Sequence, residues 1–188
     1  MDDTTLRQVP LFPLGTALFP GGYLPLRIFE VRYLDMIGKA HREGSPFGVV
    51  TLTQGSEVQR PAGPGGGEGA YAPEAFMPVG TLATITALHA PQPGLLVIRC
   101  QGARRLRVLC SEKLRHGLWV ADVALLPEDT PLAVPEDLRP VADALDAVIV
   151  RMQAQGLPAE ALPLQPPYRL DDCAWVANRW CELLPLSP

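Results

Sequence analysis

Proline is the residue that most limits how this chain can fold, because 21 of its 188 residues are proline, roughly twice the usual share of about 5%. A proline has no backbone N–H to donate, and its ring fixes φ. It therefore interrupts helices and is largely confined to the edges and ends of sheets. From this content we expect short strands and helices that are joined by stiff turns.

The composition is that of a folded chain, and the net charge gives no strong attraction to polyanions. Hydrophobic residues make up 47% of the sequence, which is enough to build a core and excludes global disorder. The formal net charge of −4 gives no attraction to nucleic acid or to an anionic membrane. The polar start Met1–Thr5 lacks the basic and apolar regions of a secretory signal, and no apolar run reaches the ~18 residues of a membrane span. We therefore expect a cytoplasmic protein with reduced cysteines and no contact with a membrane.

The strand signals lie before Pro127. β-Branched residues and alternating polarity predict strands at Phe47–Thr53, Val79–Leu88, Leu95–Cys100, Arg104–Leu109 and Leu118–Leu126. We expect the third and fourth of these strands to form a hairpin that turns at Gln101–Gly102. In the first thirty residues, apolar pairs alternate with Pro-Gly turns, which favours very short strands at sheet edges.

Helical spacing dominates the C-terminal third. One helix is predicted nearer the N-terminus; it begins at Val31 and is ended by Glu43–Gly44. After Pro127, apolar residues recur every three or four positions over Leu138–Met152, and Asp137 is the expected N-cap. A last helix is predicted from Asp171 or Asp172 to Leu184. Strands followed by helices indicate an α+β fold.

No combination of residues predicts catalysis. The serines lack a G-x-S-x-G motif and a neighbouring base at a useful spacing. The glycine-rich stretch Arg60–Gly69, which we expect to be a mobile loop, has neither the lysine nor the hydroxyl of a P-loop. The histidines are far apart in sequence, and the cysteines form no C-x-x-C pair. We therefore predict no catalytic residue, no metal site and no cofactor.

A group of arginines gives the alternative hypothesis. Arg105 and Arg107 are expected on one face of a strand, next to Arg104 and to Arg99 of the predicted hairpin partner. A basic sheet face can follow a nucleic-acid backbone, so this surface is a candidate for RNA. A solvated outer face explains the same pattern, and the acidic net charge argues against RNA.

Several blocks of the sequence resemble a known family in order and spacing. The blocks are Val9–Leu14, Leu18–Gly22, Leu24–Glu30, Arg32–Tyr33, Phe47–Val50, Val79–Ala83 and Gly102–Val108. Together they resemble the Lon protease N-terminal (substrate-binding) domain family, and in particular its free-standing bacterial members. The resemblance covers most of residues 9–126 and extends more loosely over the helical part.

The resemblance implies both a fold and a role. The implied fold is a PUA-like pseudo-barrel of short mixed strands over residues 1–127, followed by a helical subdomain over residues 128–188. The implied role is non-catalytic binding of unfolded or extended polypeptides, with a protease or a chaperone as a possible further partner. The ATPase P-loop and the Ser-Lys protease of full-length Lon are missing from this sequence, so we do not expect an enzyme.

The resemblance does not transfer a catalytic site, but its first blocks are rich in aromatic residues. Phe19, Tyr23, Phe29 and Tyr33 are candidates for lining an apolar groove that holds an extended peptide. Packing in the core is the competing explanation for all four. An exposed sheet edge that pairs with a peptide backbone is a second possible binding mode.

Overall fold

The structure is a computed structural model, and it describes residues 4–58, 72–156, 158 and 162–184. The glycine-rich stretch Arg60–Gly69 lies outside these residues. In chain order the elements are β1 (Thr5–Leu14), β2 (Tyr23–Ile28), α1 (Val31–Glu43), β3 (Phe47–Gln54), β4 (Ala75–Gln92), β5 (Leu95–Lys113), β6 (Trp119–Leu125), a 3-10 turn (Glu136–Leu138), α2 (Arg139–Gln153) and α3 (Cys173–Leu183). The predicted α+β fold is confirmed.

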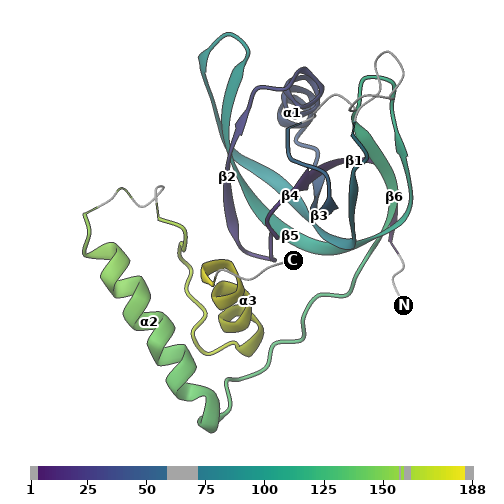
Figure 1. The fold of residues 1–188 in the computed structure, drawn as a ribbon. Coiled ribbons are helices and arrows are strands. Elements are labelled where there is room, and N and C mark those ends of the chain that lie inside the picture. Colours follow the sequence, from purple (N-terminus) through teal and green to yellow (C-terminus); the bar gives the residue numbers. More distant parts are fainter. Residues whose placement is uncertain (1–3, 59–71, 157, 159–161, 185–188) are drawn as a thin grey trace.

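Five strands close into a barrel, and a sixth lies against it. Among the described residues the strand order is β2-β5-β4-β3-β1-β6, and β6 also pairs with β5, which closes the ring (Figure 1). β1 and β3 run parallel, whereas the other pairs are antiparallel. One edge of β5 pairs with β4 along its length. The other edge pairs first with β2 and then with β6.

From the proline content we expected short strands at the edges of the sheet, but two strands are long and a third lies inside the sheet. β4 has 18 residues and β5 has 19. β1 has ten residues and lies inside the barrel wall between β3 and β6. Among the strands that the structure describes, only β2 is a short edge strand, as expected. Two prolines of β4 lie where the pairing register shifts: Pro78 in the pairing with β3 and Pro91 in the pairing with β5.

The predicted hairpin turn at Gln101–Gly102 is wrong. The chain turns at Gly94 instead, where φ is +78°, and β5 continues through Gly102. Gly102 is inside the strand because another segment of backbone approaches it closely. A Cβ atom on Gly102 would lie 2.2 Å from the carbonyl oxygen of Phe19. Gly102 also donates to the carbonyl of Gly22 at 2.8 Å and accepts from the N–H of Gly21 at 2.7 Å.

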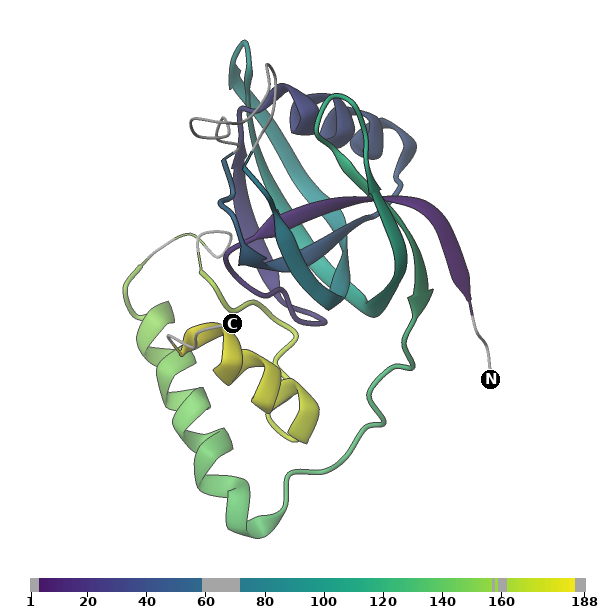
Figure 2. The ribbon, with the colours of Figure 1, turned by 45° about the vertical axis from the view of Figure 1, so that its right-hand side comes forward.

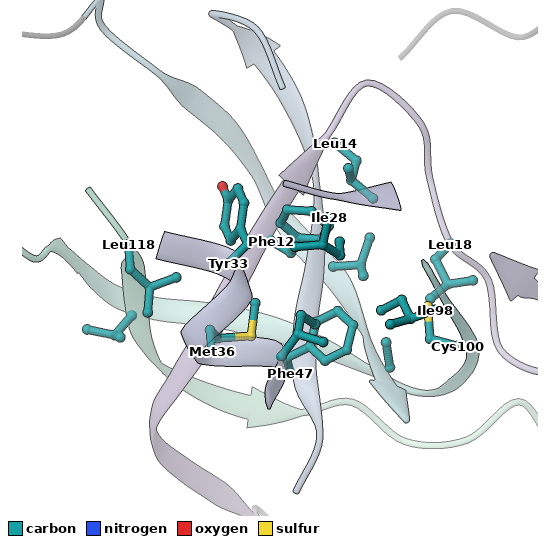
Figure 3. Close-up of a cluster of buried hydrophobic side chains, with 14 residues drawn as sticks. Phe12, Leu14, Leu18, Ile28, Tyr33, Met36, Phe47, Ile98, Cys100 and Leu118 are labelled. Carbon is teal, nitrogen blue, oxygen red and sulfur yellow. The ribbon is translucent and has the colours of Figure 1, made fainter. Parts of the chain in front are cut away.

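The main core lies between the barrel wall and α1, which covers one end of the barrel (Figure 1). Tyr33, Met36 and Ile37 of α1 are buried against barrel residues such as Phe12 and Phe47 (Figure 3). The rings of Phe12 and Tyr33 meet edge to face, with centroids 4.1 Å apart. This packing anchors the start of α1 to β1.

The two C-terminal helices lie at the opposite end of the barrel from α1 (Figure 2). They share a separate core that includes Leu145, Ile149 and Trp175. The last helix begins next to Asp172, one of its two predicted starting points, and the carboxylate of Asp172 caps it by accepting the N–H groups of Ala174 and Trp175. The predicted cap at Asp137 is wrong, because the 3-10 turn places Leu138 at the start of α2.

Replacing Gly102 tests the close approach of the two backbones. We expect Gly102→Ala to lower the free energy of unfolding by about 1–3 kcal/mol, because the added methyl collides with a carbonyl that is held by the barrel. Gly38→Ala is the matched control. Its Cβ meets only the tip of the Arg42 side chain, so the better helix propensity of alanine is expected to add about 0.5–1 kcal/mol. Urea unfolding measures both values, and equal effects would contradict the argument.

Candidate functional site

A groove beside β2 is the candidate site. Its volume is about 270 Å³, and it opens between β2 and the end of β1. Its lining is mainly apolar and consists of Phe12, Leu14, Pro25, Leu26, Arg27, Ile28, Phe29, Glu30, Tyr33, Glu57 and Val58. The groove therefore combines an apolar wall, a strand edge and a few charged groups, as binding sites commonly do.

Two of the four candidate aromatic residues line this groove. Phe29 is 55% exposed and follows the last residue of β2. Tyr33 is only 2% exposed, and its ring packs on Phe12 (Figure 3). Burial raises the pKa of the Tyr33 hydroxyl well above its ordinary value, so the group stays neutral. Phe29 is thus available to a ligand, whereas Tyr33 forms part of the wall.

The other two aromatic residues lie at the opposite end of β2. Phe19 approaches Gly102 through its backbone, and its side chain is half-buried. The ring of Tyr23 is covered by the guanidinium of Arg99, whose carbon lies 4.8 Å from the ring centroid. The four aromatic residues therefore do not form one continuous surface.

An ion-pair network lies behind the groove. Arg32 is buried, and its Nε lies 3.2 Å from a carboxylate oxygen of Glu30. The same guanidinium donates to the carbonyl of Gly117 at 2.8 Å and lies 3.6 Å from Glu74. Because α1 supplies Arg32 and Gly117 precedes β6, the network fixes the helix to the far side of the barrel.

Glu74 links this network to β5 and β6, and nothing in the local sequence indicated it. Its carboxylate accepts from Lys113 Nζ and Trp119 Nε1, each at 2.9 Å. Burial alone would raise the pKa of Glu74. The hydrogen bonds from Lys113 and Trp119, together with the positive charge of Arg32, outweigh burial and lower the pKa below its ordinary value of 4.5.

The lowered pKa of Glu74 predicts a loss of stability in acid. A carboxylate with a depressed pKa stabilises the fold above the pKa of the unfolded chain, and this contribution disappears as the pH falls through the folded value. Glu74→Gln removes this titration. We therefore expect a shallower decline in the free energy of unfolding between about pH 5 and pH 3, and a loss of about 1–3 kcal/mol at pH 7.

Chemical denaturation across this pH range provides the measurement. Glu43→Gln, which alters an exposed carboxylate at the end of α1, is the matched control and should keep the wild-type decline. An equally steep decline in Glu74→Gln would contradict the assigned role of Glu74.

The arginines proposed for RNA are largely engaged within the protein. Arg104 donates to the carbonyl of Leu126 through two nitrogens, at 3.1 and 3.3 Å. Arg105 pairs with Asp129. These contacts tie the segment after β6 to β5, so the two side chains have a structural function.

The two remaining arginines differ in their surroundings. Arg99 stacks on Tyr23 and donates to the carbonyl of Leu162. Arg107 is exposed. All four residues lie on β5 and not on two paired strands, and Arg99 and Arg107 are roughly 26 Å apart along the strand at about 3.3 Å per residue. Arg105 and Arg107 are two residues apart in a regular stretch of β5 and so share one face, whereas Arg99 is engaged with Tyr23 and Leu162.

A second pocket, of about 300 Å³, lies between β5 and the start of α3. Its charged lining is mixed, because three arginines lie beside three carboxylates: Arg104, Arg105, Arg169, Glu128, Asp129 and Asp172.

An ion pair of α3 contacts the turn between β1 and β2. Arg179 and Glu182 lie 2.9 Å apart. Arg179 donates to the carbonyl of Pro20 at 2.9 Å, and burial raises the pKa of Glu182 to about 7.

The four cysteines of the chain are free and differ in their exposure. Burial raises the pKa of the Cys100 thiol to about 12, which makes it a poor nucleophile. Cys110 is exposed, and Cys173 and Cys181 are half-buried. Within the described part of the chain, no three histidine, cysteine or acidic side chains are grouped as metal ligands. None of the described helices is both long and apolar enough to cross a bilayer.

The fold and sequence together identify the family. The family model of the ATP-dependent protease La (LON) substrate-binding domain matches residues 8–188. The chain therefore belongs to the Lon substrate-binding domain family, as the sequence blocks indicated. No curated protein matches the chain significantly.

Two solved structures show how closely the fold agrees. A Lon N-terminal domain protein from Xanthomonas campestris is 30% identical, with a TM-score of 0.69, and the match covers 98% of this chain and 85% of that chain. The N-terminal domain of Lon protease from the Mycobacterium avium complex is 16% identical, with a TM-score of 0.54, covering 96% and 85%. At that identity, the second similarity concerns the fold alone.

Proposed function

We propose that this chain is a non-catalytic module that binds unfolded or extended polypeptides through the groove beside β2. The observation that carries the proposal is Phe29, a large aromatic side chain that is 55% exposed on the rim of an apolar groove. Val31, two residues further on, is 72% exposed. Membership in a family named for substrate binding supports a polypeptide as the ligand.

The shape of the groove suits this class of ligand. It is an open groove with an apolar wall, so it accepts side chains of different sizes without a deep, selective pocket. Weak and tolerant binding is what a protein needs to capture unfolded chains before a protease or a chaperone acts on them. A cytoplasmic location fits the four free cysteines, because thiols stay reduced there.

In this proposal the two predicted subdomains have different functions. The groove belongs to the strand-built part, residues 1–127, because β1, β2 and the residues up to Val58 supply its lining. The helical part, residues 128–188, contacts the other end of the barrel through Arg179 and Pro20. In this proposal it supports the turn that leads into β2 and does not touch the ligand.

Removing the exposed aromatic ring tests the proposal. The probe is reduced, carboxymethylated α-lactalbumin, a permanently unfolded chain, titrated against the isotope-labelled protein. We expect amide shifts around residues 25–33 in the wild type, and a roughly tenfold weaker affinity in Phe29→Ser, because burial of the ring by the ligand is lost.

The matched control is Leu109→Ser. Leu109 is 56% exposed and lies on β5, outside the groove, so its loss changes surface hydrophobicity by a similar amount. Affinity equal to the wild type is expected for this variant. Equal losses in the two variants would indicate nonspecific apolar adhesion, and the absence of shifts near the groove would refute the proposed site.

A further inference from the structure

β2 has one open edge. In the part of the chain that the structure describes, β2 pairs with β5 and with no other strand. Figure 1 shows it along the outer side of the barrel, leading up towards α1. An open strand edge carries N–H and C=O groups that can pair with another extended backbone. The groove lies along this strand and is lined by every residue from Pro25 to Ile28.

The hydrogen-bond alternation shows which backbone groups face outward. Gly102 donates to the carbonyl of Gly22, and this bond lies at the start of the antiparallel ladder, at the position of a hydrogen-bonded pair. Such pairs recur at every second residue, and the register therefore directs the N–H groups of Leu24, Leu26 and Ile28 towards β5. The N–H and C=O groups of Arg27 consequently point to the open edge.

Pro25 agrees with this assignment. A proline in an edge strand has its nitrogen on the side away from the ladder, where no donor is needed. Pro25 lies two residues before Arg27 and so shares its orientation. The open edge therefore offers a short hydrogen-bonding site, with both groups of Arg27 and the carbonyl of Pro25. The proline also limits how long a strand can add, which protects the edge against aggregation.

The charged groups of the groove are balanced. Its charged lining consists of the carboxylates of Glu30 and Glu57 and the guanidinium of Arg27. Glu57 is exposed, and one of its oxygens accepts the N–H of Gly15 at 2.7 Å. Glu30 is paired with Arg32, whose Nε lies 3.2 Å from its carboxylate, so the lining retains Glu57 and Arg27 as one negative and one positive group.

We infer that an extended apolar polypeptide segment binds as an added strand on the open edge of β2. Its backbone pairs with Arg27 and Pro25, and one of its apolar side chains packs against Phe29. This inference rests on the proposed polypeptide-binding function and adds the mode of binding. Recognition through the backbone explains how one groove can accept many sequences.

Backbone-methylated peptides test the pairing directly. The probe is an acetylated and amidated peptide with the centre Val-Phe-Val between three lysines on each side. Two variants carry an N-methyl group on the central Phe or on the following Val. Since successive N–H groups of a strand point to opposite sides, we expect one methylation to weaken binding at least tenfold and the other less than threefold. Equal effects, whether small or large, would overturn strand addition.

Matched variants of Arg27 test the protein side. Arg27→Pro removes the outward N–H and the charge, whereas Arg27→Ala removes only the charge. Neither changes a hydrogen bond to β5, so both should unfold cooperatively like the wild type. We expect Arg27→Pro to bind the lysine peptide at least fivefold more weakly than Arg27→Ala. Equal affinities in two folded variants would overturn the proposal, as would a wild-type dimer that Arg27→Pro converts to a monomer, because a second copy would then occupy the edge.

The outcomes separate this inference from the function on which it rests. If Phe29→Ser weakens binding while the methylated peptides and the Arg27 variants show no selective effect, polypeptide binding stands and strand addition is wrong. If neither the lysine peptide nor unfolded lactalbumin binds the wild type, both proposals fail.

Discussion

The pairing of β5 is the constraint on which the rest of the structure depends. Along one edge β5 pairs with β4, and along the other it passes from β2 to β6. Where the partner of this edge changes from β2 to β6, Gly102 leaves room for the backbone of Phe19 and forms backbone hydrogen bonds with Gly21 and Gly22. Because β6 takes the second half of this edge, the barrel closes without β2. The same geometry therefore builds the barrel and leaves one edge strand beside an open groove.

The two ends of the barrel stabilise this arrangement by different means. At one end, Arg32 and Glu74 tie α1 to β5 and β6 through buried ion pairs. At the other end, Arg179 of α3 holds the carbonyl of Pro20, just before β2. β2 is thus fixed at its start by α3 and at its end by the α1 junction. A rigid edge of this kind binds an extended chain at a smaller entropic cost than a flexible loop would.

Much of the fold could be predicted from the sequence, but little of the site. Local patterns located α1, β3, β6 and α3, because periodicity and the Asp172 cap are short-range signals. The course of β5 through Gly102 depends on a segment eighty residues earlier, so a turn at that glycine was the natural but wrong prediction. Glu74 and Arg179 act through distant partners and had no local signature. The aromatic residues were recognisable as a set, but only tertiary packing separates the exposed Phe29 from the buried Tyr33.

The central claim, an open β2 edge that receives a polypeptide, is tested most directly by amide hydrogen exchange in β2, with and without unfolded lactalbumin. Without ligand, the account predicts slow exchange at Leu24, Leu26 and Ile28, whose N–H groups bond to β5, and fast exchange at Arg27. With saturating ligand, exchange at Arg27 should slow markedly while the other three amides change little. An Arg27 amide that is already protected in the free protein, or that gains no protection on binding, would contradict the account.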